Sequence, residues 1–494
     1  MLLTPDLCVI GGGSAGLSVA AGAARLGVSV VLVDAGIAAD GPLAGVMGGD
    51  CLHTGCVPSK ALLAVAAQAA AVRAAAGPAI QAGPPRIDFS AVMERVRAAQ
   101  ATIAPHDSVE RFTALGVTVL PGTARFESAR DVIVTARQGG GLTVVRARRV
   151  VIATGSQPRL PPVPGLDQVP VLTSTTVFTL TELPRHLGVF GGGPQGVELA
   201  QAFRRLGAEV TLITGGALLP KEDADLVTCV RHRLLEEGIV LREGGALRRA
   251  DPSGTAIRLT LEDDTSLTVS HLLAATGRSP HTAGLGLAEA GVAFGAEGIW
   301  VGRGFRTSNR RVYAVGDVAA PHGQPGPRLT HLAGWQAGQV IRAILFRLPG
   351  GVRGPVPRAV WTDPELAWVG LTESAARARY GTGVRVVTAG FDGNDRAVTE
   401  GQTDGLCKLV LIRRRLLPGW RLAGAGVVGH RAGDLLPVLT LAVQGRLSLT
   451  ALAGQILPYP SRSEVVRAAA AAAVGPAVFS APVRSVVRLL RGLP

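Results

Sequence analysis

The feature that most constrains the fold of this chain is a glycine-rich pattern that occurs twice, near residue 11 and again near residue 191. In each copy a short apolar run predicts a strand, a G-x-G-x-x-G sequence follows at once, and a helix and a second strand come next. The glycines of such a unit let the backbone approach a dinucleotide pyrophosphate at the N-terminus of the helix. The repetition therefore predicts two homologous nucleotide-binding α/β domains.

The first copy closes on an acidic residue. The strand Leu7–Ile10, a helix over 17–26 and a strand over 28–33 surround the turn, and Asp34 follows the second strand directly. A carboxylate at this position can accept a hydrogen bond from a ribose hydroxyl, so we expect Asp34 to contact the cofactor. The glycines expected to line the pyrophosphate are Gly11, Gly13 and Gly16.

The second copy has the same order but no acid. A strand over 187–190, a helix ending at Leu206 and a strand over 209–213 lead into Thr214. Neither a carboxylate for a free 2′-hydroxyl nor an arginine for a 2′-phosphate stands here, which leaves the choice between NADH and NADPH open. The glycines of this turn are Gly191, Gly193 and Gly196.

Two cysteines, Cys51 and Cys56, lie just before an apolar run that predicts a helix over 61–76. In an ideal helix, residues five positions apart have Cα atoms roughly 8–9 Å apart, whereas a disulfide tolerates no more than about 7 Å. If the two cysteines bond, the backbone must be distorted, and we expect Gly55 to supply the unusual dihedral angles. The pair would then lie at a helix N-terminus, where the macrodipole favours a thiolate.

Composition and charge limit the class of protein and its compartment. The chain has 494 residues and a net charge of +14, but its arginines are mostly scattered singly, without an aromatic-interleaved basic stripe. We therefore expect no nucleic-acid partner. Five cysteines are too few for a secreted disulfide framework, and residues 1–6 contain no basic leader. These observations predict a cytoplasmic protein, in which a lone Cys pair is more often catalytic than structural.

Further elements are predicted around the two glycine turns. Residues 89–115 read as an interrupted helical stretch, and residues 117–151 read as short strands with a turn at Pro121–Gly122. An apolar strand over 313–315 precedes a carboxylate, and a helix over 333–348 follows.

Two dinucleotide folds and one redox Cys pair suggest a relay of electrons from nicotinamide to flavin to disulfide. At this point the sequence resembles the pyridine nucleotide-disulfide oxidoreductases of the dihydrolipoamide dehydrogenase, glutathione reductase and mercuric reductase group. The resemblance covers residues 5 to about 470. It rests on motifs at Gly11–Gly16, Cys51–Lys60, Gly191–Glu198, Tyr313–Asp317 and Trp361–Gly370. The Cys motif and the order of all the motifs are the specific part of this likeness.

The resemblance implies an α/β fold with two Rossmann-like domains of the glutathione reductase type and a C-terminal α+β dimerisation domain. Residues 1–158 and 281–350 would form the FAD-binding domain, and residues 159–280 the NAD(P)-binding domain. Residues 355–475 would form the interface of a homodimer, and a basic tail over 476–494 would follow. The implied cofactors are FAD and NAD(P)H.

The resemblance also implies a role for individual residues. Cys56 would face the flavin as the charge-transfer thiolate, and Cys51 would be the interchange thiol that meets the substrate. Lys60 would lie near the flavin N5 and pair with Glu198, and Asp317 would bind the ribityl chain. The other cofactor contacts expected are Gly122, Thr154, Gly155, Ser156, Thr214 and Gly277. We expect no separate metal-binding cluster.

The sequence departs from the family pattern where dihydrolipoamide dehydrogenases and glutathione reductases carry a His-Pro pair and a Glu that orients the His. Here Tyr459 occupies the position of the base, and Glu464 keeps its spacing. A phenol with a pKa near 10 is a poor base at neutral pH, so proton transfer to a dithiol should lose part of the ~10²–10⁴-fold that general acid–base catalysis supplies. Mercuric reductases also carry Tyr here, together with a C-terminal vicinal Cys pair, whereas residues 491–494 read Arg-Gly-Leu-Pro.

The sequence leaves the electron acceptor open. The main hypothesis is an FAD-dependent NAD(P)H oxidoreductase whose Cys pair reduces a small-molecule disulfide or a soft metal ion such as Hg(II), or exchanges electrons with a dithiol. The alternative is a membrane-associated flavoprotein that reduces a quinone or a protein partner, because the His base is missing and residues 484–491 are basic and amphipathic. The tail would then make a peripheral membrane contact.

Overall fold

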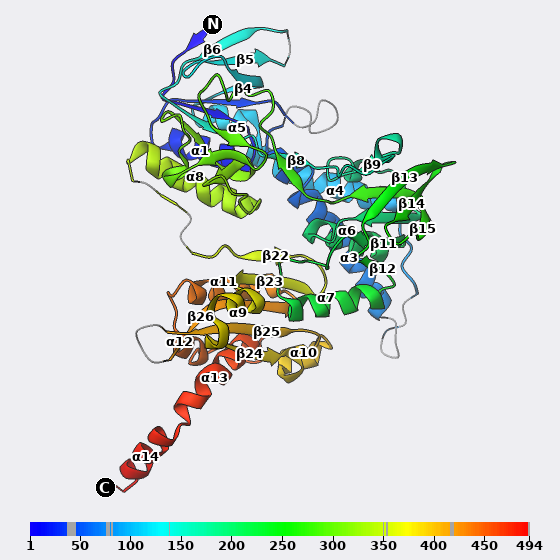
Figure 1. Cartoon of the computed structure of the whole chain (residues 1–494), viewed down its shortest axis with the longest axis vertical. Helices are drawn as coiled ribbons and strands as arrows, with labels where there is room; N and C mark the ends of the chain where they lie inside the picture. The colour runs from blue at the N-terminus through cyan, green and yellow to red at the C-terminus, as the bar shows by residue number, and fades with distance from the viewer. Residues whose placement is uncertain are drawn as a thin grey trace. The chain divides into compact units, whose positions relative to one another are not determined.

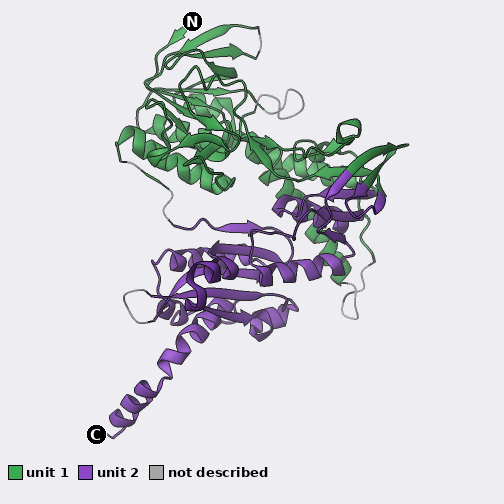
Figure 2. Ribbon diagram, viewed as in Figure 1, with its two compact units in different colours: residues 1–185, 249–259, 268–353 green, residues 186–248, 260–267, 354–494 purple. Residues whose placement is uncertain are grey.

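The structure is a computed structural model that describes residues 1–36, 46–75, 80, 83–137, 139–348, 350–351, 354–414 and 419–492. The predicted helix end at residue 76 and the predicted end of the tail at 493–494 lie outside these residues. Contacts divide the chain into two compact units, coloured green and purple in Figure 2. The first contains residues 1–185, 249–259 and 268–353, and the second contains residues 186–248, 260–267 and 354–494.

The first unit is built on an eight-stranded sheet of order β1-β6-β5-β4-β3-β2-β7-β20 (Figure 1). Strands β4, β3, β2, β7 and β20 run parallel, while β5 pairs antiparallel with both β4 and β6. Buried apolar runs such as Leu7–Ile10 form the centre, as expected for parallel strands that are covered on both faces. The bounds are β1 Leu2–Leu3, β2 Leu7–Ile10, β3 Val30–Asp34, β4 Val117–Phe126, β5 Val132–Ala136, β6 Leu142–Val145, β7 Arg149–Ile152 and β20 Val312–Ala314.

Helices α1 and α8 pack against each other and share a hydrophobic core with this sheet. The helices of the unit are α1 Ser14–Arg25, α2 Gly49–His53, α3 Cys56–Ala75, α4 Phe89–Ile103, α5 Val109–Ala114 and α8 Thr330–Leu345. Its smaller strands are β8 Ser156–Pro158, β9 Val171–Leu172, β16 His271–Ala274, β17 Arg278–Pro280, β18 Phe294–Gly295, β19 Gly298–Val301 and β21 Ala319–Pro321. Strands β13 Leu247–Ser253, β14 Ala256–Leu261 and β15 Ser266–Val269 have residues in both units.

The predicted turn at Pro121–Gly122 is wrong, because β4 runs without a break through both residues. The reason is a change of partner. Up to Pro121, β4 pairs in parallel with β3, and from Gly122 onward it pairs antiparallel with β5. Proline cannot donate to a strand ladder, and the position where the partner changes is one that tolerates it.

The second unit has a parallel part and an antiparallel part. Strands β10, β11 and β12 are parallel. The sheet β22-β23-β26-β25-β24 is antiparallel, with α11 against β23 and β26 and with α13 against β24 and β25. The strands are β10 His186–Phe190, β11 Glu209–Thr214, β12 Val240–Glu243, β22 Arg358–Val360, β23 Glu365–Gly370, β24 Val384–Gly390, β25 Leu406–Arg413 and β26 Trp420–Gly429. The helices are α6 Pro194–Leu206, α7 Ala224–Glu236, α9 Glu373–Tyr380, α10 Asp395–Glu400, α11 Ala432–Val443, α12 Leu449–Ala453, α13 Glu464–Val478 and α14 Ala481–Leu490.

Candidate active site

The first glycine turn is shaped to receive a dinucleotide. The Asp34 carboxylate at the end of β3 accepts hydrogen bonds from the backbone N–H of Gly12 at 2.8 Å and of Gly36 at 3.1 Å. A Cβ atom at Gly12 would lie 2.9 Å from the Asp34 Cγ atom, so only glycine fits beside this carboxylate. The N-cap of α1, Gly13, supplies no side-chain cap, which leaves the first N–H groups of the helix available to a pyrophosphate. These residues fit the dinucleotide that the sequence predicts.

The second glycine turn repeats this geometry with a neutral residue. Thr214 ends β11 as Asp34 ends β3, and a Cβ atom at Gly192 would lie 2.8 Å from the Thr214 Oγ1 atom. Helix α6 likewise begins after a glycine, Gly193, without a side-chain cap. The second turn therefore has the shape of a dinucleotide site but lacks a carboxylate at the strand end.

The two cysteines lie on consecutive helices. Cys51 is on α2, which ends at His53, and Cys56 is the first residue of α3. The break brings the two side chains within hydrogen-bond reach as free thiols, with Cys51 half-buried and Cys56 exposed. The prediction that Gly55 supplies unusual dihedral angles is wrong, because the left-handed φ angles occur at Gly48 (111°) and Gly49 (58°). Gly55 is needed for space instead, since a Cβ atom there would lie 2.8 Å from the Asp50 carbonyl oxygen.

The two sulfur atoms have different environments, which favour different protonation states. The hydrogen bond with Cys56, followed by burial, raises the pKa of Cys51 well above its usual value of 9.0, so this thiol keeps its proton. Cys56 lies at the N-terminus of the 20-residue helix α3, where the macrodipole favours a thiolate. The Cys56 Sγ atom also lies 3.3 Å from the Thr330 Oγ1 atom, which can donate to it. When one of the two thiols loses its proton, this arrangement therefore favours the thiolate at Cys56.

A half-buried arginine that the sequence did not single out connects α2 to the predicted flavin contacts. Arg278 pairs with the carboxylate of Asp50, the residue before Cys51. Its Nε atom donates to the Ser156 Oγ atom at 2.7 Å, and that hydroxyl donates to Asp317 Oδ2 at 2.6 Å. Burial lowers the pKa of Arg278, although a guanidinium stays protonated at any ordinary pH. The signal was available: Arg278 directly follows Gly277 in a motif that echoes Thr154–Gly155.

The other predicted residues of the first unit lie in four places. Thr154 and Gly155 follow β7, where the Thr154 hydroxyl donates to the His281 carbonyl and Gly155 has a φ of 71°. Gly277 has a φ of 108° and precedes β17. Lys60 is on the first turns of α3, with Nζ 3.4 Å from Ser59 Oγ. Gly122 lies in the β4–β5 ladder, where a Cβ atom would come 2.2 Å from the Thr135 carbonyl oxygen.

Besides the second glycine turn and Thr214, three predicted residues belong to the second unit. Glu198 on α6 is buried and accepts a hydrogen bond from the Trp361 backbone N–H at 2.8 Å. The Tyr459 side chain is exposed, and its hydroxyl donates to Asp395 Oδ2 at 2.7 Å, which raises the pKa of the phenol. Glu464 accepts from the backbone N–H of Ser461 at 3.3 Å and pairs with an arginine one turn along α13. Tyr459 is therefore held as a hydrogen-bond donor rather than as a base.

Comparison with known proteins gives a consistent result over nearly the whole chain. Residues 5–337 match the family model described as pyridine nucleotide-disulphide oxidoreductase, and residues 356–470 match the dimerisation domain of the same family. A mercuric reductase from Streptomyces lividans is 35% identical over 478 residues, covering 94% of this chain and 95% of that protein. A mercuric reductase from Lysinibacillus sphaericus is 31% identical, covering 94% of this chain and 82% of that protein.

Solved structures with the same fold include two bacterial proteins. LpdA from Mycobacterium tuberculosis has a TM-score of 0.83 and 28% identity, covering 95% of this chain and 99% of that one. The HOCl-induced flavoprotein disulfide reductase RclA from Escherichia coli, solved as a Cu(II) complex, has a TM-score of 0.82 and 26% identity, covering 95% of this chain and 99% of that one.

Proposed function

The chain belongs to the pyridine nucleotide-disulfide oxidoreductase family, and from that premise we propose which residues carry the electrons and what they reduce. The protein is an FAD- and NAD(P)H-dependent oxidoreductase, and its dimerisation domain supports a homodimer. We propose a cytoplasmic enzyme in which electrons from NAD(P)H reach a Cys51–Cys56 disulfide and pass to a disulfide or a soft metal ion. The proposed FAD domain is 1–158 with 281–350, and the proposed NAD(P) domain is 159–280.

The chain offers a distinct set of groups to each part of the cofactor. The first turn of α1 and Asp34 would hold the dinucleotide end of FAD, and Ser156 and Asp317 would hydrogen-bond its hydroxyl-bearing chain. When bound, FAD supplies the two-electron exchange between nicotinamide and disulfide. The second glycine turn with Thr214 would hold NAD(P)H. Lys60 on α3 would contact the flavin, and Glu198 on α6 would lie near the nicotinamide nucleotide.

The unequal thiol pair is the observation that carries the proposal. Reduction of the Cys51–Cys56 disulfide breaks one S–S bond, takes up two electrons and leaves up to two protons on the sulfurs. The hydrogen bond between the thiols keeps a proton on Cys51, and the start of α3 and Thr330 favour the thiolate at Cys56. Cys56 is thus suited to face the flavin, and Cys51 is suited to bond to the acceptor.

The character of Tyr459 favours a metal ion over a dithiol as the physiological substrate. A dithiol must lose its thiol protons to a base before it can reduce the disulfide, and the Tyr459 phenol, with its pKa raised by Asp395, does not accept protons at neutral pH. A soft metal ion such as Hg(II) needs no such base and binds thiolates preferentially. Mercuric reductases are also among the most similar relatives. We therefore propose Hg(II), or an ion of similar softness, as the first acceptor to test.

A steady-state screen tests this choice. Oxidation of NADH and of NADPH would be followed with Hg(II), glutathione disulfide, lipoamide and a soluble quinone, each with and without enzyme. We expect saturable turnover with Hg(II) that exceeds turnover with lipoamide. Turnover with the quinone alone, unaffected by blocking the cysteines, would overturn the proposal.

Arg278 provides a second test, because it acts through Asp50 and Ser156. Arg278→Met removes charge-assisted hydrogen bonds worth about 1.5–3 kcal/mol each, so we expect kcat/KM for the acceptor to fall about 10- to 100-fold. Fluorescence of released flavin would show whether FAD is also lost. The matched control is Arg159→Met in the same unit, since the Arg159 side chain donates a long hydrogen bond at 3.3 Å to the Thr276 carbonyl oxygen, and its backbone hydrogen bonds are kept in the variant. Equal kinetics for both variants would contradict the positioning role.

A specific observation favours a second, compatible candidate, in which α14 attaches the enzyme to an anionic membrane. All residues of Ala481–Leu490 are exposed. At 100° per residue, the apolar side chains occupy one side of α14, and Arg484 and Arg488 lie opposite, with Arg491 continuing the basic side. Helices α13 and α14 are bent by 71°, and Figure 1 shows α14 projecting from the sheet of its own unit.

Vesicle co-sedimentation tests the membrane candidate. The expected result is binding to phosphatidylserine-containing vesicles and none to neutral vesicles. Each arginine near an anionic surface contributes about 1 kcal/mol, so neutralising Arg484, Arg488 and Arg491 to Gln should weaken binding about 100-fold. Arg446→Gln, an exposed position outside α14, is the control. By length and hydropathy the described stretch Gly49–Ala75 could also cross a membrane, but it carries the Cys pair, and α3 packs on α4.

A further inference from the structure

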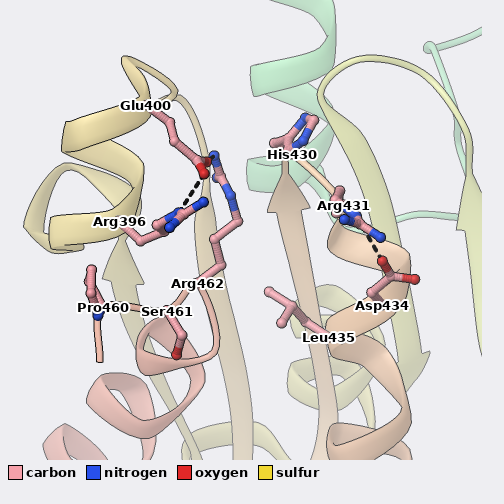
Figure 3. A pocket seen from close by; sticks show the side chains of 9 residues that line it. All are labelled: Arg396, Glu400, His430, Arg431, Asp434, Leu435, Pro460, Ser461 and Arg462. Carbon is pink, nitrogen blue, oxygen red and sulfur yellow. Dashed lines mark hydrogen bonds and ion pairs between the residues drawn. The ribbon is translucent and has the colours of Figure 1, made fainter. Parts of the chain in front are cut away.

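The dimerisation domain contains a pocket of about 330 Å³ in which basic side chains gather (Figure 3). Its lining comes from α10, from the loop before α13, and from the junction between β26 and α11. Three arginines lie on it: Arg396, Arg431 and Arg462. The size is at the lower end of the range for small-molecule sites, which is roughly 300–1,000 Å³.

The acids of the pocket do not neutralise these arginines. Glu400 accepts from Arg396 Nε at 2.5 Å and also pairs with Arg462. Asp434 pairs with Arg431, with Nε and Oδ2 2.9 Å apart. His430 adds no charge at neutral pH, because burial, and then the nearby Arg462, lower its pKa below 6.5. Three cations against two carboxylates leave a net positive charge in the pocket.

Two buried polar atoms in this pocket lack a partner among the residues that the structure describes: Arg462 Nη1 and Ser461 Oγ. The guanidinium of Arg462 is otherwise fixed, since Nη2 donates to Gln402 at 2.5 Å and Cζ lies 6.0 Å from the centre of the Phe391 ring. The Arg462 side chain is only 11% exposed. A buried donor without an acceptor is costly, so an acceptor that fills this position would be strongly favoured.

The N-terminus of α11 adds a further source of positive charge to the pocket. Arg431, the N-cap of this 12-residue helix, has a left-handed φ of 56° and makes no side-chain cap. The helix N-terminus therefore presents partial positive charge beside the pocket. A left-handed conformation at a non-glycine residue is a strain that recurs at ligand sites.

We propose that this pocket binds the oxyanion group of a small organic anion, a phosphate or a carboxylate. Arg462 Nη1 and Ser461 Oγ would donate to it, and the N-terminus of α11 with Arg431 would complete the site. The Glu400 carboxylate, which accepts from Arg462 Nη2, would orient the guanidinium. The side chains that would donate to the anion, Arg462 and Ser461, are not among the residues that carry the redox function proposed above.

Isothermal titration of the purified FAD-loaded protein tests the proposal, with inorganic phosphate and acetate as probes and chloride at equal ionic strength as the reference. We expect saturable binding of at least one probe; phosphate alone would indicate a phosphorylated ligand, and acetate alone a carboxylate. Arg462→Met should weaken binding at least about tenfold, since it removes a charge-assisted hydrogen bond. Arg446→Gln, in the same domain but outside the pocket, should change it less than about twofold.

A second variant keeps the test valid if Arg462→Met fails to fold. Arg431→Gly relieves the left-handed strain and so should fold at least as well, while the loss of the guanidinium should weaken the same binding several-fold. The absence of saturable binding to the folded wild-type protein would overturn the proposal. Equal affinity in wild type and in both pocket variants would overturn it too, because the anion would then bind elsewhere.

Discussion

The variant Cys56→Ser is expected to lose turnover of the acceptor by at least about a thousandfold, because a nucleophilic pair fails when either member is removed. Reduction of the bound flavin by NAD(P)H should remain, since that step needs no sulfur. The thiolate-to-flavin absorption band of the two-electron reduced wild type should be absent. Stopped-flow reduction followed at long wavelength, together with steady-state turnover, measures all three quantities.

The companion variant separates the roles of the two sulfurs. Cys51→Ser should lose turnover to the same extent but keep the long-wavelength band, because the thiolate at the start of α3 is still present. Cys229→Ser is the matched control, since Cys229 is a half-buried free thiol on α7. A Cys56→Ser variant that keeps the band, or a Cys51→Ser variant that loses it, would reverse the assignment of the pair.

The fold class was predictable from the sequence because local signals and tertiary structure agree in the glycine turns. Strand β2 has the predicted bounds, Leu7–Ile10, and α1, β3, α6 and β11 lie within a few residues of their predicted positions. The predicted α/β fold and family are confirmed. The wrong turn at Pro121–Gly122 has a clear cause, because a local rule for proline cannot detect a strand that changes partner midway.

The candidate site was predictable only where a motif carries the chemistry. Cys51, Cys56 and Asp34 can be identified from their spacing and from the motifs around them. Arg278 does not, because its importance depends on Asp50 and Ser156, which lie more than 100 residues earlier in the sequence. The hydrogen bond between Tyr459 and Asp395 likewise joins the loop before α13 to the start of α10, which no sequence pattern connects. Pairing between distant residues is a property of the folded chain.

The largest effect on stability is expected from Lys408, which sequence analysis did not single out. This lysine sits in β25, is 1% exposed, and lies in a cluster of three carboxylates of the second unit. Its Nζ atom is 2.8 Å from Asp223, 2.6 Å from Asp225 and 2.7 Å from Glu373. Asp223 is itself buried. Removing the lysine would leave a carboxylate without its counter-charge inside the protein.

We therefore expect Lys408→Met to lower the free energy of unfolding by about 3–5 kcal/mol, the usual cost of breaking a buried ion pair from one side. Urea denaturation followed by circular dichroism measures it. Adding Asp223→Asn should restore part of the loss, because the amide removes the unpaired charge and still caps α7. Destabilisation by Lys408→Met of less than about 1 kcal/mol would contradict the buried-pair argument.

The loss of stability in Lys408→Met should depend on pH, because the pKa values of Lys408 and Glu373 are shifted in the folded protein. Burial alone would lower the pKa of Lys408, but hydrogen bonds to Asp223, Asp225 and Glu373 outweigh it and raise that pKa above the ordinary 10.5. The stabilisation is thus complete below pH 10.5 and disappears as the pH rises through the folded-state value. At acid pH, the hydrogen bond from Lys408 lowers the pKa of Glu373 below 4.5. The contribution of Glu373 to the stability is therefore lost as the pH falls through that lower pKa. The difference in stability between wild type and Lys408→Met should be constant between about pH 5 and 10 and shrink outside that window.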